Sequence, residues 1–459
     1  MKFAVYLSNR ITFPQEIVQS ALQEVGAALM RNGFEVLPPP FPVADNRQAE
    51  TYAAFLRENA GAYDGVIAVF PNFGDESSTF LALRDAGTPI LFQAYPDRLA
   101  AMGPALRRDA FCGKISVMNL FHQGGVPCTA LEPHTVDPDS AVFDANLWRF
   151  AAICRVANGM KRLRTGSIGA RCTPFKTVRF DETTLEKYGI SNEAFDLSEV
   201  FQRYRSMKPE CEKVRTIEEN FSKNYSWPKN GGDAKKRLAR LTAVIEDMCS
   251  EYSLDLVTLR CWMELEQEFH LSPCLALAYL NGKGIIANCE VDTVNAIAMR
   301  ALSLAADAPA ACLDWNNNYG DDPDACVLFH CGPTANQLMC APGEIVDHPM
   351  FARALGAGNG LGCSQGRMRP GEFTCASGYT RNGKLSFYLE RGYFGEEQLP
   401  PEFFGCGGVA HFPQLQQKLR SLLHYGFPHH AALSYGNHLE ILREALGEYL
   451  HYDLVDLAN

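Results

Sequence analysis

Short apolar runs alternate with amphipathic helical patterns through the first third of the chain, and this alternation limits the fold more than any other feature. The apolar runs with strand character cover residues 3–7, 34–37, 65–70 and 89–92. The helical patterns cover residues 16–31, which end at the C-cap signal Asn32-Gly33, and residues 51–62. Strands separated by single helices predict βαβ units and a parallel sheet.

Ligands approach a parallel sheet of this kind at the carboxyl ends of its strands. Asn9 and Arg10 follow the first strand, and Asn72 and Phe73 follow the third. We therefore expect these four residues at the ligand-binding edge. No GxGxxG motif follows the first strand, so a dinucleotide-binding domain is not supported.

Further breaks in the pattern indicate more than one domain. The chain has 459 residues, which exceeds what one hydrophobic core usually serves, and we expect two or three domains. A break near residues 160–164 precedes a new strand and Gly-rich turn at residues 165–171. The final third carries β-like runs such as residues 384–389, and a helical pattern at residues 439–450 follows them. This last region is typical of a mostly β domain.

Charge and hydropathy exclude several classes of partner. The net charge of −11 argues against nucleic acid and against anionic membrane surfaces, since both attract basic patches. It does not exclude an anionic small substrate, which one local Arg cluster can bind. No apolar run approaches the ~20 residues that span a bilayer, and the run after Lys2 is too short for a signal peptide core.

Cysteine usage indicates a reducing compartment. Sixteen cysteines among 459 residues are far fewer than a disulfide scaffold contains. Those between residues 261 and 340 lie in or beside apolar runs, where a free thiol behaves as a small hydrophobe. No CxxC pair occurs, so a structural zinc knuckle is not expected. We expect a soluble, cytoplasmic protein.

Four short segments in the second half each carry a side chain that binds metals. They centre on Glu290, Asp314, His330 and the pair His429-His430. Carboxylates favour Mg²⁺ and Mn²⁺, and imidazoles extend the range to Fe, Ni and Zn. If these groups meet at one point, the chain holds a Lewis acid beside carboxylates that can move protons.

Each of these residues also has a purely structural explanation. Glu290 and Asp314 follow apolar runs, where a carboxylate commonly caps the next helix. Asp292 fits an N-cap better than Glu290, because it stands directly before Thr293. A histidine that ends an apolar strand, as His330 does, is more often a satisfied core residue than a ligand.

A set of segments, in the same order along nearly the whole chain, resembles one known superfamily. The matching segments are residues 8–10, 69–76, 169–171, 174–180, 289–299, Asp314-Trp315, the strand that ends at His330, and residues 428–438. They are similar to the L-fucose isomerase and L-arabinose isomerase superfamily, and in particular to its shorter fucose isomerase-like branch.

The resemblance implies a fold, an activity and an assembly. The implied fold has two Rossmann-like α/β domains with parallel sheets, at residues 1–162 and 163–305, and a C-terminal mostly β domain at residues 306–459. The implied activity is Mn²⁺-dependent aldose–ketose isomerisation in carbohydrate metabolism, with other divalent ions possible. The implied assembly is a homo-oligomer, a hexamer or another closed form, with sites at subunit interfaces.

The resemblance also implies which residues hold the ion. Glu290 and Asp314 correspond to carboxylate ligands that are also the acid/base pair. His430 corresponds to the imidazole ligand. His330 matches a histidine of the arabinose branch that the fucose branch does not reliably use as a ligand, so we assign it to substrate binding.

Four further residues are implied to contact the sugar. His429 takes the place of a polar neighbour that positions the sugar, and Trp262 stands where relatives place a polar or aromatic contact. Arg10 and Asn72 fall where the first domain of a neighbouring subunit closes over the site.

Two routes and two other functions stay open from the sequence. Isomerisation can proceed through a metal-stabilised ene-diolate, with carboxylates moving the protons, or by hydride shift between C2 and C1. The alternatives are a non-catalytic sugar-binding or regulatory protein on the same scaffold, and a metal-dependent hydrolase or lyase. The last needs a dedicated nucleophile or a third carboxylate that bridges two ions, for which Asp292 and Glu264 are the nearby candidates.

The sequence does not fix the substrate, which can be a free or modified sugar: a deoxy sugar, a pentose, or an acidic or sulfonated one. An anionic group would find four cationic candidates, which are Arg10, Arg171, Lys176 and Arg179.

Overall fold

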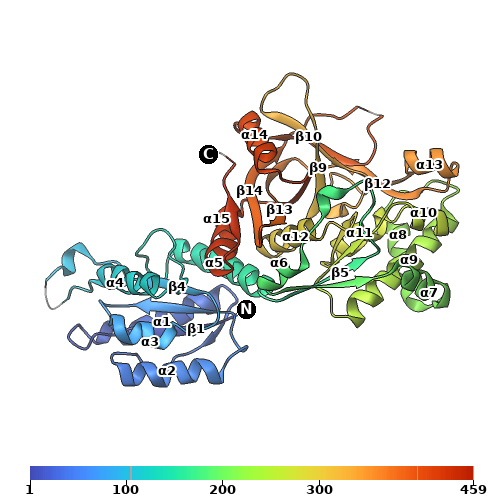
Figure 1. The fold of residues 1–459 in the computed structure, drawn as a ribbon. Coiled ribbons are helices and arrows are strands. Elements are labelled where there is room, and N and C mark those ends of the chain that lie inside the picture. The colour runs from blue at the N-terminus through green and yellow to red at the C-terminus, as the bar shows by residue number, and fades with distance from the viewer. Residues whose placement is uncertain (104–105, 401, 458–459) are drawn as a thin grey trace. The chain divides into compact units, whose positions relative to one another are not determined.

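A computed structural model describes residues 1–103, 106–400 and 402–457, which Figure 1 shows coloured along the chain. These residues form two units, each with a core of its own. The first unit contains Met1–Gly159 and Arg443–His451, and the second contains Met160–Leu442 and the residues from Tyr452 onward. The chain therefore leaves the first unit, builds most of the second and returns.

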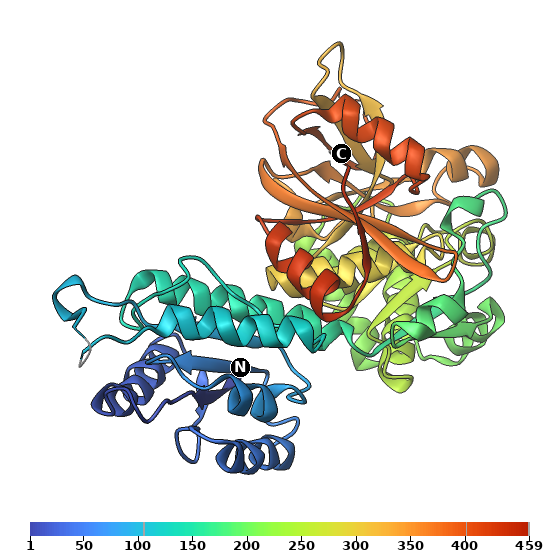
Figure 2. The same cartoon turned by 60° about the vertical axis from the view of Figure 1, so that its left-hand side comes forward.

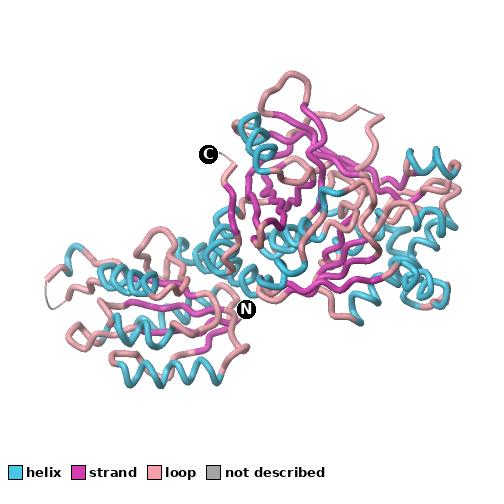
Figure 3. Tube along the Cα trace, viewed as in Figure 1, coloured by secondary structure: helices cyan, strands magenta, loops and turns pink. Residues whose placement is uncertain are grey.

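The first unit is built on a four-stranded parallel sheet of order β2-β1-β3-β4. The strands are β1 (Lys2–Leu7), β2 (Glu35–Leu37), β3 (Gly65–Phe70) and β4 (Ile90–Ala94). The helices are α1 (Glu16–Arg31), α2 (Asn46–Glu58), α3 (Glu76–Leu83), α4 (Ala110–Gln123) and α5 (Ala141–Met160), with a 3₁₀ turn at Leu99–Ala101. Figure 3 shows helices above and below this sheet, which explains why β3 and β4 are buried along their whole length.

The parallel sheet predicted from the alternating pattern is confirmed, with one helix displaced. The second helix was expected at residues 51–62 and instead spans Asn46–Glu58. Asp45 is the reason, because its side chain accepts a hydrogen bond from the backbone N–H of Gln48 and starts the helix there.

The second unit begins with another parallel sheet, of order β6-β5-β7-β8. Its strands are β5 (Leu163–Ile168), β6 (Ile190–Phe195), β7 (Leu256–Leu259) and β8 (Ile286–Cys289). Its helices are α6 (Glu182–Lys187), α7 (Leu197–Ser206), α8 (Glu212–Asn224), α9 (Gly232–Glu251), α10 (Glu264–Phe269), α11 (Cys274–Gly282) and α12 (Thr293–Ala306), with a 3₁₀ turn at Lys176–Val178.

The rest of the second unit is a barrel. Its strands are β9 (Ala311–Asn318), β10 (Ala325–His330), β11 (Glu344–Asp347), β12 (Leu361–Arg367), β13 (Gly371–Arg381), β14 (Lys384–Phe394), β15 (Cys406–His411), β16 (His430–Tyr435) and β17 (Asp453–Val455). The other elements are a 3₁₀ turn at Asn336–Leu338, α13 (Pro349–Leu355), α14 (Leu415–Tyr425), α15 (Leu439–Leu442) and a π-helix at Arg443–Tyr449, which belongs to the first unit.

Antiparallel pairing runs in the order β15-β10-β9-β16-β13-β14, and β14 pairs again with β15, so the sheet closes on itself. Closure removes the exposed edges that an open sheet would present. Helix α12 packs against β13 and β16, and Figure 2 shows it as the yellow helix beside the orange and red strands of the barrel. The second parallel sheet and the barrel thus meet around α12.

The predicted fold class is confirmed: two α/β parts with parallel sheets and a mostly β part. The exact domain boundaries at residues 162 and 305 stay a prediction. Among the residues that the structure describes, no helix is both long and apolar enough to cross a lipid bilayer.

Candidate active site and metal centre

Three segments bring Glu290, Asp314 and His430 together. Glu290 lies in the short turn between β8 and α12. Asp314 lies on β9 and His430 begins β16, and the antiparallel register of these strands places the two residues directly opposite each other. Because α12 packs against β16, the turn that carries Glu290 lies against the same end of the strand pair.

In these three residues, which we call the ligand triad, one oxygen of each carboxylate lies near the same imidazole nitrogen. His430 Nε2 lies 3.4 Å from Glu290 Oε2 and 3.4 Å from Asp314 Oδ1. Ligands that surround a small divalent ion at about 2.1 Å stand roughly 3 Å apart, so the spacing of each carboxylate from the imidazole fits a shared ion.

Each of the three atoms is buried, and none makes a hydrogen bond within the described residues. Buried polar atoms without partners are costly and rare. Two carboxylate oxygens and one imidazole nitrogen suit Mn²⁺ or a similar divalent ion. The residues present therefore fit the metal that the resemblance implies.

Asp292 fixes which nitrogen of His430 is free. His430 Nδ1 donates to Asp292 Oδ2 at 2.6 Å, and both side chains are buried. A ring that donates through Nδ1 keeps a lone pair at Nε2, which is the form a metal requires. The other oxygen, Oδ1, accepts from the backbone N–H of Asn295 and caps α12.

His330 has the opposite arrangement. The backbone N–H of Cys331 donates to His330 Nδ1 at 2.9 Å, so Nδ1 accepts and Nε2 carries a proton. That Nε2 is buried and has no partner within the described residues. The side chain thus presents an N–H donor rather than a metal-binding lone pair.

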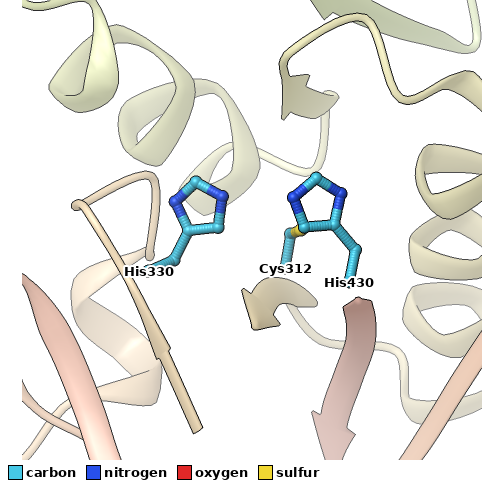
Figure 4. A group of neighbouring side chains, drawn as sticks. All are labelled: Cys312, His330 and His430. Atoms are coloured by element: carbon cyan, nitrogen blue, oxygen red, sulfur yellow. The ribbon is translucent and has the colours of Figure 1, made fainter. Parts of the chain in front are cut away.

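Figure 4 shows the rings of His330 and His430 near each other, together with Cys312. The ring centroids are 5.6 Å apart. Cys312 lies on β9 two residues before Asp314, so the strand turns both side chains to the same face. From the sequence, Cys312 was grouped with the other cysteines in apolar runs, and its position beside the two histidines was not predicted.

A cavity of about 350 Å³ opens beside these groups. It is lined by Phe175, Trp262, Glu290, Asp314, Phe329, His330, Cys331, His348, Pro349, Met350, Phe404 and His429. Most of this wall is aromatic or apolar, with a small number of carboxylate and imidazole groups, as in small-molecule sites generally.

His429 and Trp262 both face this cavity. His429 Nε2 lies 3.6 Å from Asp314 Oδ1, and the side chain is 40% exposed. Phe175 links the two residues: its ring stacks on His429 with centroids 6.3 Å apart and meets Trp262 edge-on at 5.4 Å.

Arg10 and Asn72 lie in the first unit, where they contact each other. Asn72 Oδ1 accepts from the backbone N–H of Arg10 at 3.1 Å, and the Arg10 guanidinium lies over the ring of Phe73 at 4.3 Å. Their expected contact with a sugar stays a prediction.

Two family models match most of the chain. The N-terminal domain of fucose/sulfoquinovose isomerases matches residues 4–161, and the C-terminal domain of L-fucose isomerase matches residues 328–458. The chain belongs to the fucose isomerase-like family. It is therefore an aldose–ketose isomerase.

Two relatives of this isomerase are distant in sequence but match over most of their length. It is 23% identical to a sulfoquinovose isomerase of Priestia aryabhattai over 97% of this chain and 96% of that protein. It is also 23% identical to a sulfoquinovose isomerase of Alkalicoccus urumqiensis over 88% of each chain.

Neither carboxylate of the isomerase's ligand triad caps a helix, so the structural explanation considered for Glu290 and Asp314 does not apply. Asp314 lies inside β9, and the cap of α12 is Asp292, as the sequence suggested. The second role of Asp292, at His430, was missed, and only its spacing of two residues from Glu290 hints at it.

The turn at Glu290 is strained. Glu290 and Val291 have φ values of 62° and 59°, in the left-handed region that β-branched residues avoid. Each such residue costs on the order of 1–3 kcal/mol and persists only where the surroundings enforce it. Here Asp292 begins α12 on one side and Cys289 ends β8 on the other, which leaves two residues to aim the carboxylate inward.

The carboxylates that a hydrolase would need are engaged elsewhere. Glu264 forms an ion pair with Arg260 at 2.6 Å, and Asp292 holds His430 and the helix cap. The cationic candidates Arg171, Lys176 and Arg179 do not appear among the residues that line the cavity.

Proposed function

We propose that this isomerase depends on a divalent ion, Mn²⁺ in the first instance, and acts on a monosaccharide in the cavity beside the ligand triad. The observation that supports this most directly is that two buried oxygens, Glu290 Oε2 and Asp314 Oδ1, each lie 3.4 Å from the buried His430 Nε2, and that all three atoms lack hydrogen-bond partners in the described residues.

A bound ion would supply a Lewis acid for the negative charge that develops on the sugar oxygens. The proton transfers belong to the chain's own carboxylates. Burial opposes ionisation of Glu290, but while no ion is bound the positive charge of protonated His430, 3.4 Å away, outweighs burial and lowers the pKa of the carboxyl. Glu290 is therefore ionised near neutral pH, and we assign to it the removal of the C2 proton.

Asp314 and His429 are placed to handle the hydroxyl proton. Burial and the neighbouring His430 lower the pKa of His429, so its ring is neutral near pH 7. A neutral ring can accept and return a proton. With Asp314 3.6 Å away, the pair can pass one proton between two adjacent sugar oxygens.

The walls of the cavity indicate how the sugar is oriented. Ring faces of Phe175 and Trp262 can cover its apolar side, while Nε2–H of His330 donates to an oxygen at the polar end. We propose a free sugar, either neutral or modified at the end remote from C1. The relatives are named for sulfoquinovose, a sulfonated sugar, which makes it the leading candidate.

A sulfonate would need a cation that the lining of the cavity does not supply. We propose that the first domain of a neighbouring subunit brings Arg10 and Asn72 to the site in a closed homo-oligomer. We also propose a cytoplasmic location, which the free state of all sixteen cysteines supports.

The deciding experiment incubates the metal-stripped protein with a panel of aldoses, including sulfoquinovose, 6-deoxyhexoses and pentoses, with and without Mn²⁺. We expect ketose to form from one class of sugar with Mn²⁺ and not after EDTA. When the reaction is run in deuterated water, proton transfer by Glu290 should place deuterium at C1 of the ketose, whereas a hydride shift should place none there.

Glu290→Gln is the matched variant, since it keeps the shape and removes the base. We expect it to lose turnover by at least about 10²-fold. Turnover that survives EDTA would rule out the metal mechanism. Sugar binding by both proteins with no turnover by the wild type would identify a binding protein instead.

A further inference from the structure

A row of six cysteine side chains runs beside the ligand triad, and the proposed reaction uses none of them. We call Cys172, Cys261, Cys289, Cys331, Cys274 and Cys363 the thiol row. The sulfur of Cys289 lies 3.0 Å from that of Cys261, Cys331 lies 3.8 Å from Cys274, and Cys274 lies 3.6 Å from Cys363. Cys172 contacts Cys261, and Cys331 contacts Cys289, which completes the row.

The centre of the row lies at the carboxyl edge of the second parallel sheet. Cys289 is the last residue of β8, and Cys261 follows β7, the neighbouring strand. Both thiols are buried, with exposed fractions of 0% and 3%. The same strand ends position Glu290, the next residue after Cys289.

Glu290 faces two different sets of ligand atoms. A carboxylate oxygen of Glu290 lies within 4.8 Å of ring nitrogens of His429 and His430. A carboxylate oxygen also lies within 4.8 Å of the sulfurs of Cys261 and Cys289. The first set is oxygen and nitrogen and suits a hard ion. The second is dominated by sulfur, which selects soft ions such as Cd²⁺, Zn²⁺ or Cu⁺.

We propose that Cys261, Cys289 and Glu290 form a second ion site, selective for thiophilic metals, which shares Glu290 with the ligand triad. Binding replaces the two thiol protons by the ion and releases them to water. Because Glu290 cannot serve both ions equally, a soft ion draws it away from the triad. The expected loss of turnover rests on the proposed function, whereas the binding site does not.

The site can be tested on the wild-type protein without any sugar. One equivalent of Cd²⁺ is added to metal-free, reduced protein, and X-ray absorption at the cadmium edge counts the sulfur atoms around the ion. We expect two sulfurs with oxygen in the remaining positions. No sulfur would place the ion in the ligand triad, one would place it at Cys312 with His330 and His430, and three or more would place it elsewhere in the row. Each of these three results overturns the proposal.

Variants provide the second measurement. Cys261→Ser and Cys289→Ser should each weaken Cd²⁺ binding by roughly tenfold or more, since each removes one soft ligand. Cys375→Ser, at a buried cysteine of β13 outside the row, should bind Cd²⁺ as the wild type does. Equal Cd²⁺ affinity in all four proteins would contradict the proposal, and a melting curve for each shows whether it folds.

Inhibition separates this site from the proposed function. With Mn²⁺ present, Cd²⁺ should lower turnover of the wild type at lower concentrations than it does for Cys261→Ser. If no sugar is turned over at all but two sulfurs surround Cd²⁺ in the wild type and one in Cys261→Ser, the proposed function fails and the thiophilic site stands. If Cd²⁺ inhibits both proteins at the same concentration, the shared role of Glu290 is wrong.

Discussion

At the scale of single residues, Asp292 does two jobs with its two oxygens, and one substitution separates them. Asparagine caps helices about as well as aspartate, so Asp292→Asn should keep the start of α12. It loses the carboxylate that holds His430 Nδ1–H at 2.6 Å. Loss of such a partner typically weakens metal binding 10–100-fold. We expect this drop in Mn²⁺ affinity by calorimetric titration, with the melting temperature nearly unchanged.

Asp196→Asn is the control for Asp292→Asn. Asp196 caps α7 in the same unit through Ser198 and lies outside the cavity lining. The Asp196→Asn variant should bind Mn²⁺ with the same affinity as the wild type. Equal affinity in both variants would show that Asp292 does not orient the ligand.

His330 and His430 should respond differently to the same change. His330→Ala removes a donor to the sugar, so KM should rise by about 10-fold or more, the loss expected from one hydrogen bond to a buried group, while Mn²⁺ affinity stays within about twofold. His430→Ala removes a ligand and should abolish tight Mn²⁺ binding. If His330→Ala loses Mn²⁺ as His430→Ala does, His330 is a ligand and the tautomer assignment is wrong.

Glu266 makes stability depend on pH. Burial, reinforced by Cys172, raises the pKa of this carboxyl from 4.5 to about 8, and neither oxygen has a hydrogen-bond partner in the described residues. Between pH 4.5 and 8 the folded state holds a proton that the unfolded state has lost, so stability falls as pH rises. The full effect is on the order of 4–5 kcal/mol.

Glu266→Gln should remove this dependence. Denaturant unfolding at several pH values should show the variant gaining stability relative to wild type as pH rises from 4.5 to 8. Glu268→Gln, at an exposed position of the same helix, should follow the wild-type curve. If stability varied with pH in the same way for the wild type and Glu266→Gln, the raised pKa of Glu266 would be refuted.

Sequence reasoning reached the ligand triad through residue type and resemblance, but it could not assign protons. The difference between His330 and His430 depends on which neighbour each Nδ1 meets, and those neighbours are Cys331 and Asp292. The thiol row was also out of reach, because sulfurs 28 residues apart, such as those of Cys261 and Cys289, meet only through strand pairing.

At the scale of elements, the register of β9 with β16 makes the site. A shift of one residue would turn His430 to the opposite face of the barrel and away from Asp314. Leu433, which is fully buried opposite Ala311, helps to hold that register.

Leu433→Ala should destabilise the second unit by about 2–5 kcal/mol, the usual cost of a large cavity in a core. Leu423→Ala, on α14 with the side chain 84% exposed, should change stability by less than about 0.5 kcal/mol. Chemical denaturation followed by far-UV circular dichroism measures both. Similar values for the two variants would mean that β16 is not packed as described.

Local sequence patterns predicted the individual helices and strands well, but they did not predict that the strands close into a barrel. The helix expected at residues 16–31 has those bounds, because its apolar spacing and C-cap are local signals. The strand expected at residues 384–389 extends to Phe394, and its outer half pairs with β15 at Tyr393 and His411. No local period encodes that pairing, so barrel closure could not be read from the sequence.

At the scale of the whole molecule, the two units have separate cores, and only the second contains the ligand triad. Mn²⁺ at 100 times its dissociation constant should stabilise the folded state by about 2.7 kcal/mol. Scanning calorimetry should show this gain in the transition of the second unit alone. In the Asp314→Asn variant the gain should shrink or vanish, and an equal shift of both transitions in the wild type would contradict the assignment.

The segment that returns to the first unit is held there by a half-buried tyrosine, Tyr449. Tyr449 Oη lies 2.8 Å from Thr129 Oγ1 and 3.2 Å from the backbone N–H of Ile90, which donates to it. Residues 443–451 are thus a structural part of a unit whose other residues all precede position 160. During synthesis, the ribosome must translate the whole of residues 160–442 before it delivers this piece. The first unit, whose main part emerges first, therefore stays incomplete until most of the second unit has been made.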